Sequence, residues 1–244
     1  MKKLLISLVF CLFVDAYSQI HFLYDFNRQP QGYGSNFSSI SYDFIKPDTF
    51  GYTFYTIDFY FRCNQVAYME LSRNVILFKN LALHAEFDGG LYYINNNIGG
   101  VVHDAFLFGL SIPLTLGVNY LEFQILPKKY SGYTVNDDNT YNYYKGLDGQ
   151  ITMIWNIPIS KKFLFNGYID IWSQKLDSYY NFDPLCKRNY VILSEPQLSY
   201  NINKIFTLET RHRISQHFSW NIKSDGTIYN KFSIFPCIGL KINL

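Results

Sequence analysis

The sequence predicts an all-β protein, folded as a closed antiparallel transmembrane β-barrel of about 12 strands. Aromatic residues make up 19% of the chain, with 22 Tyr and 22 Phe, whereas charged residues make up only 16%. Apolar and polar residues alternate at every second position through most of the chain, and no stripe with a helical period is sustained. Short turns also alternate with long polar links. This combination is typical of barrels whose strands each turn one apolar face to lipid, with aromatic residues at both membrane interfaces.

The first residues predict a secretory signal peptide, residues 1–18. The segment has a basic start, an apolar run from Leu4 to Val14, and small residues at Ala16 and Ser18. The apolar run is too short to cross a bilayer as a helix, which takes about 20 residues. We therefore expect cleavage after Ser18, a barrel formed by residues 19–244, and localisation in the cell outer membrane of a Gram-negative bacterium.

The expected strands follow the alternating pattern in chain order. Tight turns are expected at PDTF, KNL, the corner from Pro113 to Thr115, PISK and INK, and most of the other links are long and polar. In outer-membrane barrels the short turns face the periplasm. The expected strands are residues 20–27, 36–46, 51–62, 66–77, 81–92, 104–113, 115–126, 147–157, 162–174, 190–201, 204–215 and 231–243.

The alternation also assigns two faces to the barrel. One face is almost wholly apolar and includes Phe22, Ile57 and Leu83, so we expect it to contact lipid. Carboxylates outnumber basic groups on the other face, and so many charges in a dry core would be costly to desolvate. We therefore expect water inside. The charged and His residues assigned to this face are Asp25, Asp43, Asp58, Arg62, Glu70, His84, Glu86, Asp88, Glu122, Asp148, Asp170, Glu195, Glu209, Arg211, Arg213 and Lys241.

A barrel of this size leaves a narrow passage, since eight strands are nearly filled by side chains and sixteen leave an open channel. Inward aromatic rings could stack against a planar solute, or they could only fill space. A tight turn joins the expected strands 190–201 and 204–215. The register that this turn suggests sets Glu195 opposite Arg211, which predicts an ion pair between them. The residues expected to line the pore or bind solute are Phe54, Asp58, Tyr60, Arg62, Glu70, His84, Glu86, Asp88, Tyr168, Asp170, Trp172, Glu195, Glu209, Arg211 and Arg213.

Several segments resemble the Tsx-like nucleoside-specific channel family of outer membranes, and more closely an uncharacterised branch of it. They are residues 44–61 (FIKPDTFGYTFYTIDFYF), 68–80 (YMELSRNVILFKN), 84–90 (HAEFDGG), 168–175 (YIDIWSQK) and 193–204 (LSEPQLSYNINK). The resemblance implies a 12-stranded barrel that passes nucleosides or other small polar solutes passively. It carries over no individual solute-binding residue.

Two other functional classes stay open at this point. A serine hydrolase on the lipid face would use Ser194 with His212 opposite, but we find no third group to orient the His and no oxyanion hole. A barrel could also serve as a structural protein or bind a partner through its long loops. We expect no enzyme activity and no cofactor. We also expect no metal site, because the His residues do not have the spacing of metal ligands. Without the signal peptide the formal net charge falls from +2 to +1, because Lys2, Lys3 and Asp15 are removed, and this argues against nucleic acid as a partner. Outer-membrane lipid and a small polar solute are the expected partners, and the oligomeric state is open.

Overall fold

The computed structural model describes residues 17–26, 36–61, 65–95, 98–131, 133–135, 141–143, 147–174, 189–217 and 232–244. Regular structure in these ranges consists of β-strands. Within the same ranges, no helix has the length and apolar character needed to cross a membrane. The signal peptide stays a prediction, because residues 1–16 lie outside the described part of the chain.

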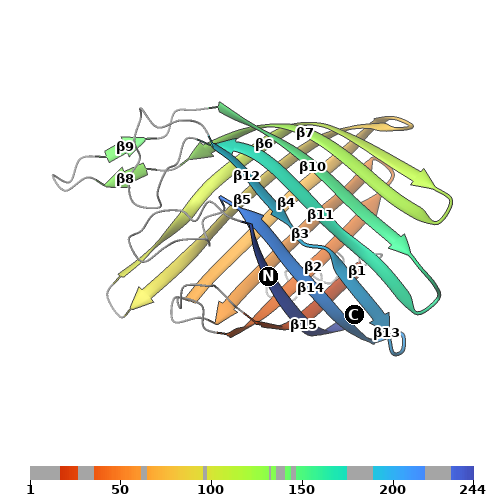
Figure 1. Ribbon diagram of the computed structural model, residues 1–244. Coiled ribbons are helices and arrows are strands. Elements are labelled where there is room, and N and C mark those ends of the chain that lie inside the picture. The colour runs from red at the N-terminus through yellow and green to blue at the C-terminus, as the bar shows by residue number, and fades with distance from the viewer. Residues whose placement is uncertain are drawn as a thin grey trace, which may run out of the picture.

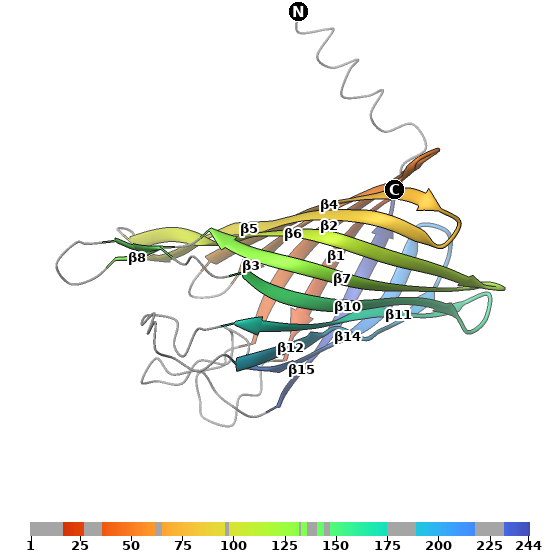
Figure 2. The ribbon, with the colours of Figure 1, turned by 90° about the horizontal axis from the view of Figure 1, so that it is seen from above.

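The strands form one large antiparallel sheet that curls into a barrel (Figures 1 and 2). A separate hairpin, β8 with β9, lies at one end of it. The strands are β1 (Tyr17–Asp25), β2 (Phe37–Asp48), β3 (Gly51–Phe61), β4 (Gln65–Phe78), β5 (Leu81–Asn95), β6 (Ile98–Leu116), β7 (Asn119–Ser131), β8 (Tyr133–Val135), β9 (Tyr141–Tyr143), β10 (Leu147–Pro158), β11 (Phe163–Gln174), β12 (Asn189–Ser194), β13 (Gln197–Asn201), β14 (Phe206–Gln216) and β15 (Ser233–Asn243).

The barrel closes where β1 pairs with β15, with Ile20 opposite Ile242. The sheet has 13 segments, but β12 and β13 are two parts of one strand. Against β11, Ser194 pairs with Ile169 and Gln197 with Asn166, so the register does not change across the break. The predicted closed antiparallel barrel of 12 strands is therefore confirmed.

Short turns join the strands at one end of the barrel. Two-residue turns connect β2 to β3, β4 to β5, and β6 to β7. The predicted corner from Pro113 to Thr115 is wrong, because β6 continues to Leu116 and the chain turns at Gly117, where φ is +65°. A glycine adopts this left-handed conformation without the steric cost that a side chain would add. We call this end the short-turn end and the opposite end the long-loop end.

The side chains alternate between the two faces as expected. Phe22 on β1 is 44% exposed, while His21 beside it is 2% exposed. On β7, Ile125 is 63% exposed and Glu122 is fully buried. The outer face is therefore mostly apolar, and most polar residues of the strands point into the barrel.

The inner face is not polar along its whole height, and of its buried apolar side chains the sequence analysis expected Trp172. Ala105, Leu107 and Leu126 form a buried apolar cluster on β6 and β7. Other buried apolar side chains point inward from the long-loop half of their strands. They are Leu23, Phe37, Trp172, Val191, Phe235 and Cys237.

Candidate pore lining

Four carboxylates gather inside the barrel, and we call them the acid cluster. Glu70 on β4 lies directly opposite Asp88 on β5. Glu86 is also on β5, two residues before Asp88 and on the same face. Asp170 reaches the group from β11 and is close enough to interact electrostatically with Glu70 and Glu86. The hydroxyl group of Thr152 donates to Asp170 at 2.5 Å. Ionised carboxylates in this part of the interior attract cations.

Lys128 on β7 is the lysine that the described structure places beside the acid cluster. Its ammonium group is 3.8 Å from Asp88 Oδ2, donates to Gln150 Oε1 at 2.8 Å, and lies 4.7 Å from the centre of the Trp172 ring. One lysine cannot balance four carboxylates. This side of the interior therefore keeps an excess of acidic groups.

Two arginines on β14 form a second group with the carboxylate of Glu195, and we call Arg211 and Arg213 the arginine pair. Arg213 Nε donates to Glu195 Oε1 at 2.5 Å, and Arg211 Nη1 lies 3.6 Å from Glu195 Oε2. The guanidinium group of Arg213 also lies over the Tyr60 ring, 5.6 Å from its centre. Tyr60 in turn donates to Asp58 Oδ2 at 2.9 Å. Here acidic and basic groups are matched.

The expected register of this group is wrong by two residues. Gln197 pairs with Arg211 and Ser194 with Ile214, which places Glu195 level with Arg213 rather than with Arg211. The ion pair with Arg211 exists, but it runs diagonally. The expected inward direction of both side chains is correct, because a shift of two residues keeps each side chain on its face.

The same register separates the two residues of the hydrolase alternative. Ser194 Oγ donates to the backbone carbonyl of Tyr168 at 2.8 Å, and its cross-strand neighbour is Ile214. The amide of His212 instead donates to the carbonyl of Pro196. Ser194 and His212 are therefore not the cross-strand neighbours that the sequence suggested.

A fully buried carboxylate, Glu122, ties five polar side chains together near the short-turn end. Oε1 accepts from Asn74 at 3.0 Å, Ser111 at 2.7 Å and Gln124 at 2.7 Å. Oε2 accepts from Tyr52 at 2.8 Å and from Tyr120. Tyr52 is on β3 and Glu122 is on β7, so this bond crosses the interior past three intervening strands. We call these six side chains the Glu122 network.

Two histidines inside the barrel join this polar packing. His21 Nδ1 lies 2.8 Å from Glu209 Oε1, and its Nε2 lies 3.2 Å from Asp43 Oδ2. His84 lies 2.9 Å from Glu86 and 3.1 Å from the Asn74 side chain. These contacts link the acid cluster to the Glu122 network. In the residues that are described, no group of three or more His, Cys, Asp or Glu side chains could hold a metal ion.

The structure sorts the expected pore residues into these groups. Glu70, Glu86, Asp88 and Asp170 form the acid cluster, and Asp58, Tyr60, Glu195, Arg211 and Arg213 meet around β14. Phe54 lies on the inner face of β3, Tyr168 on that of β11, and Glu209 contacts His21. Arg62 lies outside the described residues. That these side chains bind solute stays a prediction.

Sequence reasoning missed several polar residues that complete these groups, among them Tyr52, Asn74, Ser111, Gln124 and Lys128. Lys128 was missed because the expected strand stopped at Leu126, before Pro127. The alternation of Gln124, Leu126 and Lys128 would have revealed it, since the pattern runs through the proline.

Comparison with known proteins places the chain in a family. A model described as "Domain of unknown function (DUF5020)" matches residues 16–244. The chain belongs to this family. No curated protein matches the DUF5020 chain. The resemblance to nucleoside-specific channels stays a prediction, because the description of the family gives no function.

Solved structures of porins share the fold of the DUF5020 chain. The NanC porin structure aligns with a TM-score of 0.60 at 10% sequence identity, covering 93% of this chain and 100% of that one. The KdgM porin aligns with a TM-score of 0.50 at 8% identity, covering 93% and 99%. At these identities the likeness shows the fold alone. The DUF5020 chain therefore has the barrel fold of outer-membrane porins.

Proposed function

We propose that this protein is an outer-membrane channel through which small hydrophilic solutes diffuse passively, with a preference for cations and neutral polyols over anions. The acid cluster carries the proposal. Four carboxylates lie within reach of one another inside the barrel, with Lys128 as the nearby counter-charge. An interior of this charge lowers the energy of a passing cation and raises that of an anion.

The outer face supports a position in a membrane. Large apolar side chains on neighbouring strands are half exposed or more, among them Phe108 at 61%, Ile125 at 63% and Ile151 at 57%. Apolar side chains of this size are stable beside lipid and would be costly in water. The porin fold and the short turns at one end agree with an outer-membrane barrel.

The finer choice of solute rests on the aromatic and acidic groups together. Tyr60, Tyr68 and Tyr168 point inward from β3, β4 and β11, close to the carboxylates of both groups. Flat rings can stack on a planar base, and carboxylates accept hydrogen bonds from hydroxyl and amino groups. Nucleosides offer both features, in line with the resemblance found in the sequence.

Single-channel recording in planar bilayers tests the proposal. With a KCl gradient across the bilayer, we expect the reversal potential to indicate preference for potassium. The double variant Glu70→Gln with Asp170→Asn should move that potential toward zero, because it removes two charges of the acid cluster. Addition of adenosine should reduce the current if nucleosides enter the same passage.

The matched control is Asp48→Asn, which removes a carboxylate at the exposed short-turn end rather than inside the barrel. It should leave the potassium preference of the wild type nearly unchanged. A barrel that carries no current, or one that prefers chloride, contradicts the proposal. Current that adenosine does not reduce removes the nucleoside assignment but leaves the channel.

A further inference from the structure

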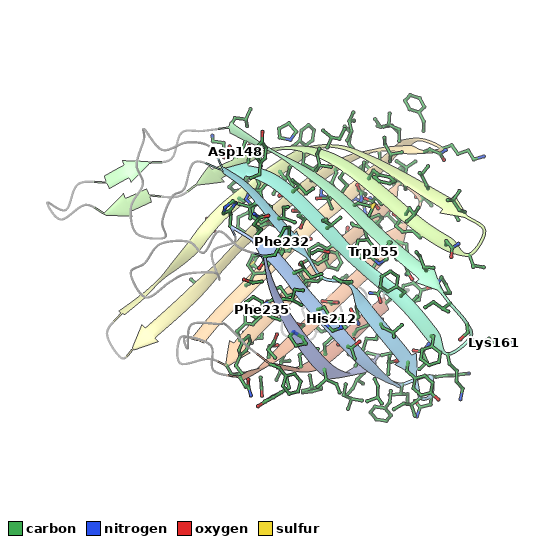
Figure 3. The ribbon with its side chains drawn as sticks, viewed as in Figure 1. Asp148, Trp155, Lys161, His212, Phe232 and Phe235 are labelled. Atoms are coloured by element: carbon green, nitrogen blue, oxygen red, sulfur yellow. The ribbon has the colours of Figure 1, made fainter. Side chains whose placement is uncertain are left out.

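Basic side chains gather around the outside of the short-turn end, and we call them the lysine rim. The turn between β4 and β5 holds Lys79, the turn between β10 and β11 holds Lys161 and Lys162, and the turn between β13 and β14 holds Lys204. Lys46 lies two residues before the end of β2. Figure 3 shows Lys161 at this end of the barrel and Asp148 at the opposite end of β10.

Positive charge prevails at the turns that hold Lys79, Lys161, Lys162 and Lys204. The turn residues of the five short turns include no Asp or Glu. Asp48, at the end of β2, already binds Arg73 through two hydrogen bonds of 2.7 and 3.0 Å. The rim therefore presents a net positive charge.

Exposed apolar side chains sit directly beside the lysines. Phe50 and Phe78 are each 69% exposed and Val118 is 76% exposed, all in or next to short turns. Lys162 lies over the Tyr200 ring, with 5.6 Å from its ammonium nitrogen to the ring centre. An ammonium group held beside aromatic and apolar side chains is the arrangement expected at the boundary between hydrocarbon and headgroups.

We propose that the lysine rim binds the headgroups of anionic phospholipids in the leaflet that faces the short turns. The lysines come from three turns and one strand end, so they surround much of the barrel and can each meet a different lipid. Apolar neighbours bury into the acyl region while the ammonium groups reach the phosphates above it. The inference needs the barrel to span a membrane, as proposed above, but it does not need the barrel to conduct.

Quenching of Trp155 by brominated lipids tests this binding. Trp155 lies on the outer face, three residues before the end of β10, and is therefore near the rim (Figure 3). A barrel with Trp172→Phe and Trp220→Phe keeps Trp155 as its one tryptophan. It is refolded into vesicles of phosphatidylcholine that contain either brominated phosphatidylglycerol or brominated phosphatidylcholine at equal fractions, with bromine on the same acyl positions.

We expect brominated phosphatidylglycerol to quench Trp155 more strongly than brominated phosphatidylcholine, with a relative affinity about three-fold higher. One or two lysine contacts per lipid would give a preference of this order. The preference should fall as salt rises, because it is electrostatic. Replacing Lys79, Lys161, Lys162 and Lys204 by Gln should abolish it, and the double change at 161 and 162 should lower it partly. The control Lys129→Gln removes an exposed outer charge near the long-loop end and should leave it intact.

Three results overturn the proposal. Equal quenching by the two lipids in the single-tryptophan barrel with all its lysines intact shows that the rim has no headgroup preference. A preference that survives the four substitutions shows that other groups cause it. No quenching by either lipid shows that the outer face does not meet acyl chains, which also removes the membrane position assumed under the proposed function. A silent channel with normal lipid preference, in contrast, affects the conduction proposal alone.

Discussion

Glu122 shows at the scale of one residue how this barrel stabilises charge without a cation. Its carboxylate accepts five hydrogen bonds from side chains on four strands, and it is fully buried. Hydrogen bonds to a charged acceptor contribute more than those between neutral groups. Glu70 is a contrast, because none of the described residues forms a hydrogen bond or ion pair with it.

Glu122→Gln should therefore destabilise the barrel by roughly 1–3 kcal/mol, because the new amide nitrogen would face groups that already donate. The measurement is urea unfolding followed by the gel shift between folded and unfolded barrel. Glu70→Gln is the control and should not lower stability, since it removes a repelling charge. If both variants unfold at the same urea concentration, the role given to Glu122 is wrong.

The partners of Glu122 could not be predicted from the sequence. Side chains alternate between the two faces within a single strand, so a short stretch of sequence is enough to place Glu122, Tyr120 and Gln124 on one face of β7. Tyr52 and Asn74, however, reach Glu122 from β3 and β4. Which side chains meet across the interior depends on how the closed barrel staggers its strands, and no short stretch of sequence holds that information.

The strand made of β12 and β13 shows the effect of local chemistry at the scale of an element. The ladder is interrupted at Pro196, which has no N–H to donate. Gly167 on β11 lies beside this break with φ of +152°. A Cβ atom there would lie 2.5 Å from the Glu195 carbonyl oxygen and 2.8 Å from the Trp155 ring. The glycine therefore lets β10, β11 and the broken strand approach closely.

Gly167→Ala should lower the unfolding free energy by about 2 kcal/mol or more, from backbone strain and the clash with Glu195. Urea unfolding in detergent measures the change. Gly149→Ala on β10 is the matched control, because a Cβ atom there meets nothing within 4 Å. Equal stability of the two variants would show that the sheet relaxes around residue 167 at little cost.

Strand positions and faces could be predicted for most of the barrel, but register could not. A face follows from alternation within one strand, whereas register depends on the length and conformation of the adjoining turn. The turn from Asn201 to Thr207 is longer than the sequence suggested, and this moved Glu195 from Arg211 to Arg213. Strand ends were also expected at Pro113 and just before Pro127, but both prolines lie within strands.

At the scale of the whole molecule, the two halves of the interior differ. The short-turn half is filled with polar side chains that bind one another, including the Glu122 network and His21 with Glu209. The long-loop half carries most of the inward apolar side chains. A solute that crosses the polar half, as proposed, would pass beside hydrogen bonds that cross the interior.

Tyr52→Ala removes the side chain that spans from β3 to Glu122 and should increase single-channel conductance. The expected change is a rise of at least about two-fold, since the ring fills space inside a small barrel. Recordings in planar bilayers at fixed salt measure it. Tyr55→Ala is the control, because Tyr55 is on the outer face next to Tyr42 and should leave conductance as in the wild type. Unchanged conductance in Tyr52→Ala would place the narrowest point elsewhere.

The position of the arginine pair has an electrostatic consequence for any molecule inside the barrel. Arg211 and Arg213 are on β14, while Glu70 and Asp88 are on β4 and β5, close to halfway around the wall. The field between these groups runs sideways, across the direction of travel. A zwitterion inside the barrel lowers its energy by rotating its ammonium end toward the unbalanced carboxylates on β4 and β5.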